Sequence, residues 1–436
     1  MKITIWGINY SPELTGIAPY NRALCDFLNS RGHRVRMVTS FPYYPAWQKR
    51  PEDRRRLYRT DNVWGVPVHR CYHYVPGGPT SLKRILHESS FVLASFLRLV
   101  TLPRPDVYVV ISPPLLLGAA AWLLTRIKRA PFVFHVQDLQ PDAACGLGML
   151  KRGLFTRALY ALEGFAYRKA ARVSGICRGM LEVFQRKGVP PRKIVYFPNG
   201  VEFTSKEHLP PPGRFRARQG FGRDEFLAVY SGNLGVKQGL EILIEAAPLI
   251  RDPRIRIVIC GDGAERERLA AEIRLRQITN VRLIPLQPEE RYLEMLTDAD
   301  LCLITQKRGA GAFFLPSKVL RSLAMSRPVL AVADESSELT RALRAGGFGI
   351  TVEPDDPRSL AGALENLAED RQRLRRFGDS GREFVKQFEM TRVLEQFQNE
   401  LQWLVKGETR VPTFPAPLSG APAPERRSTG VQEVGG

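Results

Sequence analysis

The chain alternates short apolar runs rich in β-branched residues with longer runs in which apolar residues recur every three or four positions. The first kind is typical of buried parallel strands and the second of amphipathic helices. In the first half, the expected strands are residues 2–8, 33–40, 105–112, 131–138, 171–177 and 193–200. Between the first two lies an expected helix, residues 15–32, on which Ile17, Tyr20, Leu24, Phe27 and Leu28 share one face.

The second half repeats this alternation. Strands are expected at residues 226–232, 255–263, 281–286, 299–305, 327–332 and 348–352, with helices such as 239–250 and 289–299 between them. Strands that alternate with helices indicate an α/β fold with two doubly wound parallel sheets. We therefore predict a first domain at residues 1–200, a second at 201–375 and a helical stretch at 376–407. The Pro-, Ala- and Gly-rich tail, residues 408–436, is expected to be disordered.

The longest apolar stretch, residues 107–125, has no charged residue and is long enough to suggest a membrane span. Pro113 and Pro114 divide it into a β-branched half and a half rich in Leu and Ala, so we interpret it as a buried strand followed by a buried helix. The N-terminal apolar run is too short for a signal peptide. The six cysteines form no CxxC pair, which favours reduced thiols in a cytosolic protein.

Charge is unevenly distributed along the chain. The net charge is +20, and residues 1–200 hold 30 of the 64 Lys and Arg but only 11 of the 44 Asp and Glu. An excess of this size in one half predicts a polyanionic partner, which is nucleic acid, anionic lipid or a phosphorylated substrate. Residues 40–65 combine aromatic residues with an arginine cluster, and we expect a loop that either contacts an anionic acceptor or lipid headgroups or is solvated.

Ligands of parallel sheets bind beyond the carboxyl ends of the strands, so polar residues at strand ends are the candidates for chemistry. Gly16 follows the first strand and precedes a helix, whose N-terminus can hold a phosphate. His135 interrupts an apolar strand and Asp138 follows it. A histidine in a buried strand is most often a core residue, but at the end of a sheet beside an acid it can bind a polyhydroxyl substrate.

Two lysines stand at starts of helical segments in the second half. Lys237 lies in the stretch "SGNLGVKQG" between a strand and a helix; this is neither a Walker A loop nor GxGxxG, yet it suits a diphosphate. Pro316 and Ser317 mark another helix start, with Lys318 in its first turn. Because the helix dipole disfavours a cation there, Lys318 indicates that an anion binds nearby. The two lysines are therefore predicted to converge on one diphosphate.

Together these segments resemble the family 4 retaining nucleotide-sugar glycosyltransferases, which have the GT-B fold. The resemblance extends to about residue 405 and rests on "YSPELTGIAPY", "GHRVRMVTS", "HVQDLQPD", "YFPNGV", "YSGNLGVKQGLEILIEAA", "CGDGAERERL" and "RPVLAV". The segments "SFPYYPAW", "GNLGVKQGLE" and "LPSKVL" are most similar to the WcaI-type enzymes of colanic acid and related exopolysaccharide assembly, which are associated with GDP-fucose.

The resemblance implies an acceptor-binding first domain, a donor-binding second domain and a last helix that crosses back to the first. It implies that the catalytic residues are His135, Asp138 and Lys237. By the same resemblance, the donor phosphates lie at Gly16, Gly232, Asn233, Lys237, Ser317 and Lys318, and the donor sugar and nucleotide at Gly261, Asp262, Gly311 and Arg321. No metal or other cofactor is expected, because lysines and helix dipoles can compensate the leaving diphosphate.

The chain departs from the family pattern in the loop, where Asn233 and Gln238 stand in place of an arginine and a lysine. The two family glutamates, eight positions apart, are replaced by Phe313 and Arg321. Ser317, Lys318 and the backbone at Gly311 are therefore the candidates to contact the donor instead.

The implied function is transfer of a hexosyl or deoxyhexosyl unit from a GDP- or UDP-sugar to a polyprenyl-diphosphate-linked or other glycan acceptor. The enzyme would be cytoplasmic and would contact the anionic inner face of the plasma membrane through its basic first domain. One alternative keeps the fold and makes the protein a sugar-nucleotide epimerase. Others are a basic nucleic-acid-binding protein, although no RRM, helix-turn-helix or zinc pattern is present, and a Rossmann oxidoreductase, although GxGxxG is missing.

Overall fold

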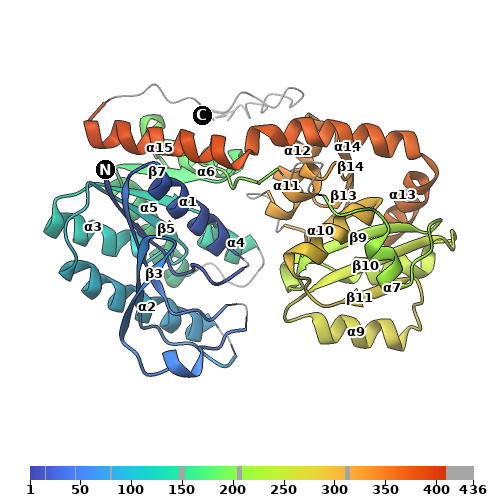
Figure 1. The fold of residues 1–436 in the computed structure, drawn as a ribbon, viewed down its shortest axis with the longest axis horizontal. Helices are drawn as coiled ribbons and strands as arrows, with labels where there is room; N and C mark the ends of the chain where they lie inside the picture. The colour runs from blue at the N-terminus through green and yellow to red at the C-terminus, as the bar shows by residue number, and fades with distance from the viewer. Residues whose placement is uncertain are drawn as a thin grey trace, which may run out of the picture.

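The computed structural model describes residues 1–408 except for residues 15, 45, 79–80, 147–152, 204–208 and 310–314. The described part forms two α/β domains that lie side by side, with helices α14 and α15 running along both of them (Figure 1). The predicted disordered tail falls outside the described residues apart from Glu408.

The first domain is built on an eight-stranded sheet with the strand order β3-β4-β2-β1-β5-β6-β7-β8. All neighbouring strands are parallel except β3 and β4, which form an antiparallel hairpin at the edge. The strands are β1 (Lys2–Trp6), β2 (Arg34–Ser40), β3 (Tyr58–Val63), β4 (Val66–Cys71), β5 (Val107–Ser112), β6 (Phe132–Val136), β7 (Arg172–Gly175) and β8 (Ile194–Tyr196). The helices are α1 (Ala18–Ser30), α2 (Ser81–Thr101), α3 (Leu117–Lys128), α4 (Gln140–Gly146), α5 (Leu154–Lys169) and α6 (Arg178–Arg186), with short 3-10 turns at Pro51–Asp53 and Pro191–Lys193.

Both faces of this sheet are covered, which explains why its central strands β5 and β6 are largely apolar and buried at every position. On one face, Ile3 and Ile5 of β1 belong to the same core cluster as residues of α1 and α15. On the other, Trp6 packs among residues of α2, α3 and α5, and its indole nitrogen donates to Ser95 Oγ at 2.9 Å.

The second domain has a six-stranded parallel sheet with the order β11-β10-β9-β12-β13-β14. Its strands are β9 (Phe226–Asn233), β10 (Ile255–Asp262), β11 (Val281–Ile284), β12 (Leu301–Thr305), β13 (Val329–Val332) and β14 (Gly349–Val352). Its helices are α7 (Arg214–Gln219), α8 (Glu241–Ala246), α9 (Arg266–Leu275), α10 (Glu289–Asp298), α11 (Ser317–Ala324), α12 (Glu338–Gly346), α13 (Pro357–Glu369) and α14 (Arg371–Val385), with 3-10 turns η4 (Val236–Gln238) and η5 (Ala247–Leu249). The predicted doubly wound sheets are thus confirmed.

Two expectations were wrong in detail. Residues 40–65 are not one loop, because β3 pairs with β4 through a hairpin whose turn is formed by Trp64 and Gly65, both at positive φ. The apolar stretch at 107–125 is divided at the two prolines into β5 and α3, as predicted, but α3 is not buried on all sides, because Leu123 on it is 47% exposed. No helix in the described part of the chain is long and apolar enough to cross a membrane.

The C-terminal helical stretch is not continuous either. It breaks at a 3-10 turn, η6 (Lys386–Phe388), between α14 and α15 (Met390–Lys406). Val385 at the end of α14 packs within the second domain, whereas Phe397 and Leu401 of α15 pack into the first. The predicted boundary at residue 375 therefore lies inside α14, and the crossing to the first domain occurs at η6. There Met390 N donates to Val201 O, which ties the two connections between the domains together.

None of the six cysteines, all of which lie in the described part of the chain, forms a disulfide, and five of them are buried. This agrees with the expectation of reduced thiols.

Candidate active site

Each sheet reverses its strand order at one place, and the loops that follow the central strands meet there. β1 lies between β2 and β5, and β9 lies between β10 and β12. In open α/β sheets such a reversal is where ligands bind. The loop after β1 carries Gly16, which has φ +68° and directly precedes α1, and the loop after β9 carries Lys237. The topology thus gives the two predicted phosphate loops equivalent places in the two domains.

Lys237 faces the first domain. Its Nζ lies 3.8 Å from Oδ2 of Asp138, which follows β6, and the side chains are 43% and 44% exposed. Partial burial raises the pKa of the Asp138 carboxyl, and the neighbouring ammonium opposes this rise. Charge-assisted hydrogen bonds are usually 2.7–2.9 Å long. The longer separation leaves the ammonium free to donate to a third group placed between the domains.

Lys318 lies in the first turn of α11, as predicted, and its ammonium lies against the ring of Tyr230. Its Nζ stands 3.7 Å from the ring centroid of Tyr230, and a Cβ built on Gly232 would lie 3.6 Å from its Cδ. Within the described residues, no carboxylate comes within ion-pair distance of it. Burial therefore lowers the pKa of Lys318 to about 7.

Tyr20 connects this helix start to the first domain. Burial raises the pKa of the Tyr20 hydroxyl, and the nearby side chains of Ser317 and Arg321 on α11 oppose this rise. Since Tyr20 is in the first turn of α1, the segment that begins with Gly16 lies against the beginning of α11. Tyr20 was not among the predicted site residues, although it ends the quoted motif "YSPELTGIAPY".

Gly232, Asn233, Gly261 and Asp262 lie side by side at the ends of β9 and β10, where Gly232 pairs with Gly261 and Asn233 with Asp262. A Cβ on Gly261 would be 1.9 Å from the Gly232 carbonyl oxygen, so backbone packing alone requires this glycine. Asp262 Oδ1 accepts a hydrogen bond from the Gly263 amide at 2.8 Å. The exposed ends of both strands border the Lys237 loop.

His135 is buried, and both its ring nitrogens have partners. Nδ1 is 2.9 Å from Ser174 Oγ and Nε2 is 2.8 Å from Gln137 Nε2, which also donates to Asn199. Burial lowers the pKa of His135 to about 3, so the ring is neutral at neutral pH. A small pocket reaches it, with Tyr20 in its lining. The environment is that of a core histidine, and its catalytic role stays a prediction.

Arg321 is held away from the lysines by an acidic partner. Its two terminal nitrogens bind the two carboxylate oxygens of Glu289 at 2.9 and 2.7 Å, and Glu289 begins α10. The Glu289 carboxylate thus lies beside Arg321, the position at which the resemblance implies a glutamate, and Glu289 was not among the predicted site residues. Gly311 and Phe313 lie outside the described residues.

Both halves of the chain match models of known protein families. Residues 15–200 match the model of a glycosyl transferase 4-like domain, and residues 213–384 match that of glycosyl transferases group 1. The colanic acid biosynthesis glycosyl transferase WcaI of Escherichia coli K12 is 34% identical over 412 residues, which are 92% of this chain and 100% of that protein. The chain is a family 4 glycosyltransferase.

Solved structures of similar proteins show that this glycosyltransferase has the GT-B fold. Sucrose-phosphate synthase from Thermosynechococcus elongatus superposes with a TM-score of 0.73 at 18% identity, covering 93% of this chain and 99% of that one. The Anabaena protein HepE, in complex with UDP-glucose, gives a TM-score of 0.67 at 16% identity, with 92% and 99% covered. The epimerase and nucleic-acid-binding alternatives find no support in these comparisons.

Proposed function

We propose that this glycosyltransferase moves a hexosyl or deoxyhexosyl unit, with retention of configuration, from a GDP- or UDP-sugar to a lipid-linked or saccharide acceptor. The product would be an exopolysaccharide or related cell-surface glycan. The relative named for colanic acid biosynthesis, which matches along its whole length, supports this class of product. GDP-fucose is the leading donor in this proposal because the resemblance to WcaI-type enzymes implies it. The likeness to HepE with bound UDP-glucose supports a nucleotide-sugar donor.

The observation that carries the proposal is the pair of cations at the domain interface. The Lys237 ammonium can still donate hydrogen bonds beside Asp138, and Lys318 has no carboxylate partner among the described residues. As the bond from the anomeric carbon to the diphosphate breaks, negative charge grows on the leaving oxygen. Ammonium groups held in a partly desolvated site stabilise that charge, which is a role that a metal ion has in other transferases. We therefore propose a metal-independent reaction.

A panel of UDP- and GDP-sugars, screened for thermal stabilisation and then for hydrolysis, tests the reaction. We expect one donor to stabilise the protein and to be hydrolysed slowly in the presence of a chelator. Lys237→Ala should lower the rate by about 100-fold or more, since removal of one group that stabilises transition-state charge costs 10²–10³-fold. Lys386→Ala, at an exposed lysine paired with Glu383, is the matched control. Full activity in Lys237→Ala would refute the assignment.

We also propose that the first domain docks peripherally on the anionic inner leaflet of the plasma membrane. On α2, the side chains of Leu82, Leu93 and Leu97 are 80%, 63% and 53% exposed, and on the adjacent α3 Leu123 and Ile127 are 47% and 50% exposed. Apolar groups this exposed on neighbouring helices are unusual for a surface that meets only water. Basic residues accompany them on the same helices: Lys83, Arg98 and Arg126.

Sedimentation with vesicles tests this docking. We expect binding to vesicles of phosphatidylglycerol and phosphatidylcholine but not to phosphatidylcholine alone, and a sharp loss of binding as salt is raised, because each well-placed cation contributes about 1 kcal/mol. Replacing Leu93 and Leu97 by serine should weaken binding and leave donor hydrolysis unchanged. Association that ignores salt, or none at all, would contradict the electrostatic part.

A further inference from the structure

The aromatic segment after β2 is fixed rigidly to the loop that carries Gly16. Both Tyr43 N and Tyr44 N donate to Oε1 of the buried Glu13 at 2.9 Å, and Asn9 Nδ2 donates to its other oxygen at 2.8 Å. A Cβ built on Gly16 would lie 3.7 Å from the ring of Tyr44. The aromatic side chains after β2 are therefore held directly beside the predicted donor-phosphate loop.

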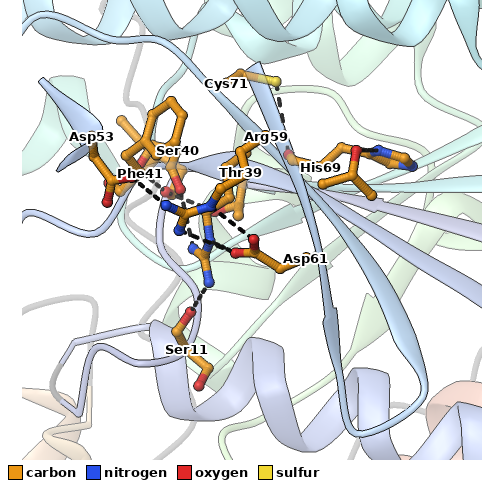
Figure 2. A network of polar contacts seen from close by, with 12 residues as sticks. Ser11, Thr39, Ser40, Phe41, Asp53, Arg59, Asp61, His69 and Cys71 are labelled. Carbon is orange, nitrogen blue, oxygen red and sulfur yellow. Dashed lines mark hydrogen bonds and ion pairs between the residues drawn. The ribbon is translucent and has the colours of Figure 1, made fainter. Parts of the chain in front are cut away.

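A second network fixes the same segment from the hairpin side (Figure 2). Arg70 donates to the carbonyl of Ser11 at 2.8 Å and binds Asp61, and Arg59 pairs with both Asp61 and Asp53. Asp53 is fully buried at the end of the segment. Glu13 thus holds the first part of this segment and Asp53 holds its end, and both carboxylates are buried. A loop that only faces solvent does not require such contacts.

Trp47 lies within this anchored segment with φ +51°. A bulky residue rarely adopts this conformation, and such strain gathers at ligand sites. Trp64 has a similar φ of +49°, but there the turn of the β3–β4 hairpin requires it. No hairpin explains Trp47, whose half-buried indole is held within a rigid segment.

The beginning of α2 places charged groups beside that indole. The guanidinium of Arg84 lies 5.6 Å from the ring centroid of Trp47. One turn later, Glu88 accepts a hydrogen bond from Gln140 Nε2 at 3.1 Å. Gln140 is two residues beyond Asp138, the partner of Lys237. A chain of contacts therefore links the Gly16 loop, through the aromatic segment and α2, to the loop that carries Asp138.

We propose that Tyr44, Trp47, Arg84 and Glu88 form the subsite for the acceptor saccharide of this glycosyltransferase. A hexopyranose ring stacks on Trp47 and Tyr44, Arg84 donates to a ring substituent, and Glu88 accepts a hydrogen bond from the hydroxyl that is glycosylated. This inference rests on the proposed function, and it specifies the residues that bind the saccharide to which the sugar is transferred.

The state of Glu88 supports its part. Burial raises the pKa of its carboxyl to about 7, although Gln140 and Arg84 act in the opposite direction. Gln140 supplies the one hydrogen bond that Glu88 accepts from the described residues, and a carboxylate can accept about four. Its remaining capacity suits a substrate hydroxyl.

The test separates transfer from hydrolysis. With the nucleotide sugar that wild type hydrolyses, we would measure transfer to a panel of p-nitrophenyl hexopyranosides and, separately, donor hydrolysis without acceptor. For Trp47→Ala we expect the acceptor KM to rise at least about 10-fold. For Glu88→Gln we expect kcat for transfer to fall at least about 10-fold and its dependence on pH near 7 to disappear. For Trp47→Ala, hydrolysis should stay within about 2-fold of wild type, and for both variants the melting temperature should stay within about 3 °C of wild type.

Trp64→Ala is the control, and transfer should be unchanged. Transfer by Trp47→Ala and Glu88→Gln at the wild-type rate would overturn the subsite, as would a parallel loss of hydrolysis and stability. A wild-type enzyme that hydrolyses its donor and glycosylates none of these hexopyranosides would also refute it. The proposed function would fail in a different way. In that case Lys237→Ala would retain donor hydrolysis, and this result does not depend on the behaviour of Trp47→Ala.

Discussion

The state of Lys318 predicts that the affinity for a nucleoside diphosphate depends on pH. Burial lowers its pKa to about 7 in the free protein, whereas a bound diphosphate favours the charged ammonium. Binding should therefore take up a proton, and affinity should fall as the pH rises through 7. The nucleotide itself changes little above pH 7, since the second pKa of a terminal phosphate is about 6.

The size of the effect follows from the pKa. With a pKa of about 7, roughly half of the Lys318 side chains are protonated at pH 7 and about 1% at pH 9. If only the ammonium form binds, Kd rises by about 50-fold across this range, which is ~2.3 kcal/mol. Titration calorimetry with UDP and GDP at pH 7, 8 and 9, in buffers of different ionisation enthalpy, measures both the affinity and the proton uptake.

Two substitutions identify the group responsible. Lys318→Arg should bind with nearly constant affinity over this range, because a guanidinium stays charged. Lys237→Arg should keep the wild-type dependence, because Lys318 is still present. A change of less than about 3-fold in wild type, or an equal change in Lys318→Arg, would show that the Lys318 ammonium does not meet the diphosphate.

Three further predictions test the description of the fold and of the site. His135→Asn should make stability less sensitive to acid, since the pKa of the histidine is about 6.5 in the unfolded chain and about 3 in the folded one. In urea unfolding, wild type should lose about 2 kcal/mol more of its free energy of unfolding than the variant between pH 7 and 5. Equal losses would place His135 in solvent. Gly261→Ala should destabilise the second domain by at least about 3 kcal/mol, because its Cβ would collide with the Gly232 carbonyl, and an unchanged melting curve would contradict this. Phe397→Ala removes a ring stacked on Phe197 at 3.8 Å and should cost about 3–5 kcal/mol in denaturant unfolding; a loss below 1 kcal/mol would mean that α15 packs loosely on the first domain.

The sequence predicts most of the fold because both sheets are covered on both faces. Runs such as 107–111 and 257–260 are apolar throughout, and such runs indicate buried parallel strands. The strand β3 was missed for the opposite reason. At the sheet edge its residues alternate between exposed and half-buried positions, and the polar sequence "YRTDNV" is typical of a loop.

The site was predictable only as separate parts. Lys237 and Lys318 stand out because a cation at a helix start is unusual, and the topology explains why they lie at one edge. The acidic partner of Lys237 could not be predicted in this way. Asp138 is 99 positions from Lys237, and no local pattern links them. The role of His135 could not be predicted from the sequence either, because a strand buried on both faces gives no indication of which side chains point toward a ligand.

The crossing of the chain at η6 has a consequence for how such enzymes can be recombined. By packing, α15 belongs to the first domain, yet it follows the whole of the second, and residues 213–384 alone make up the second family match. The first domain is therefore discontinuous in the chain and includes residues 390–406. A chimaera that exchanges the second domain between relatives should replace only the segment between Val201 and Phe388, whose backbones are hydrogen-bonded to each other. Exchange of everything after residue 200 would also replace one wall of the first domain's core.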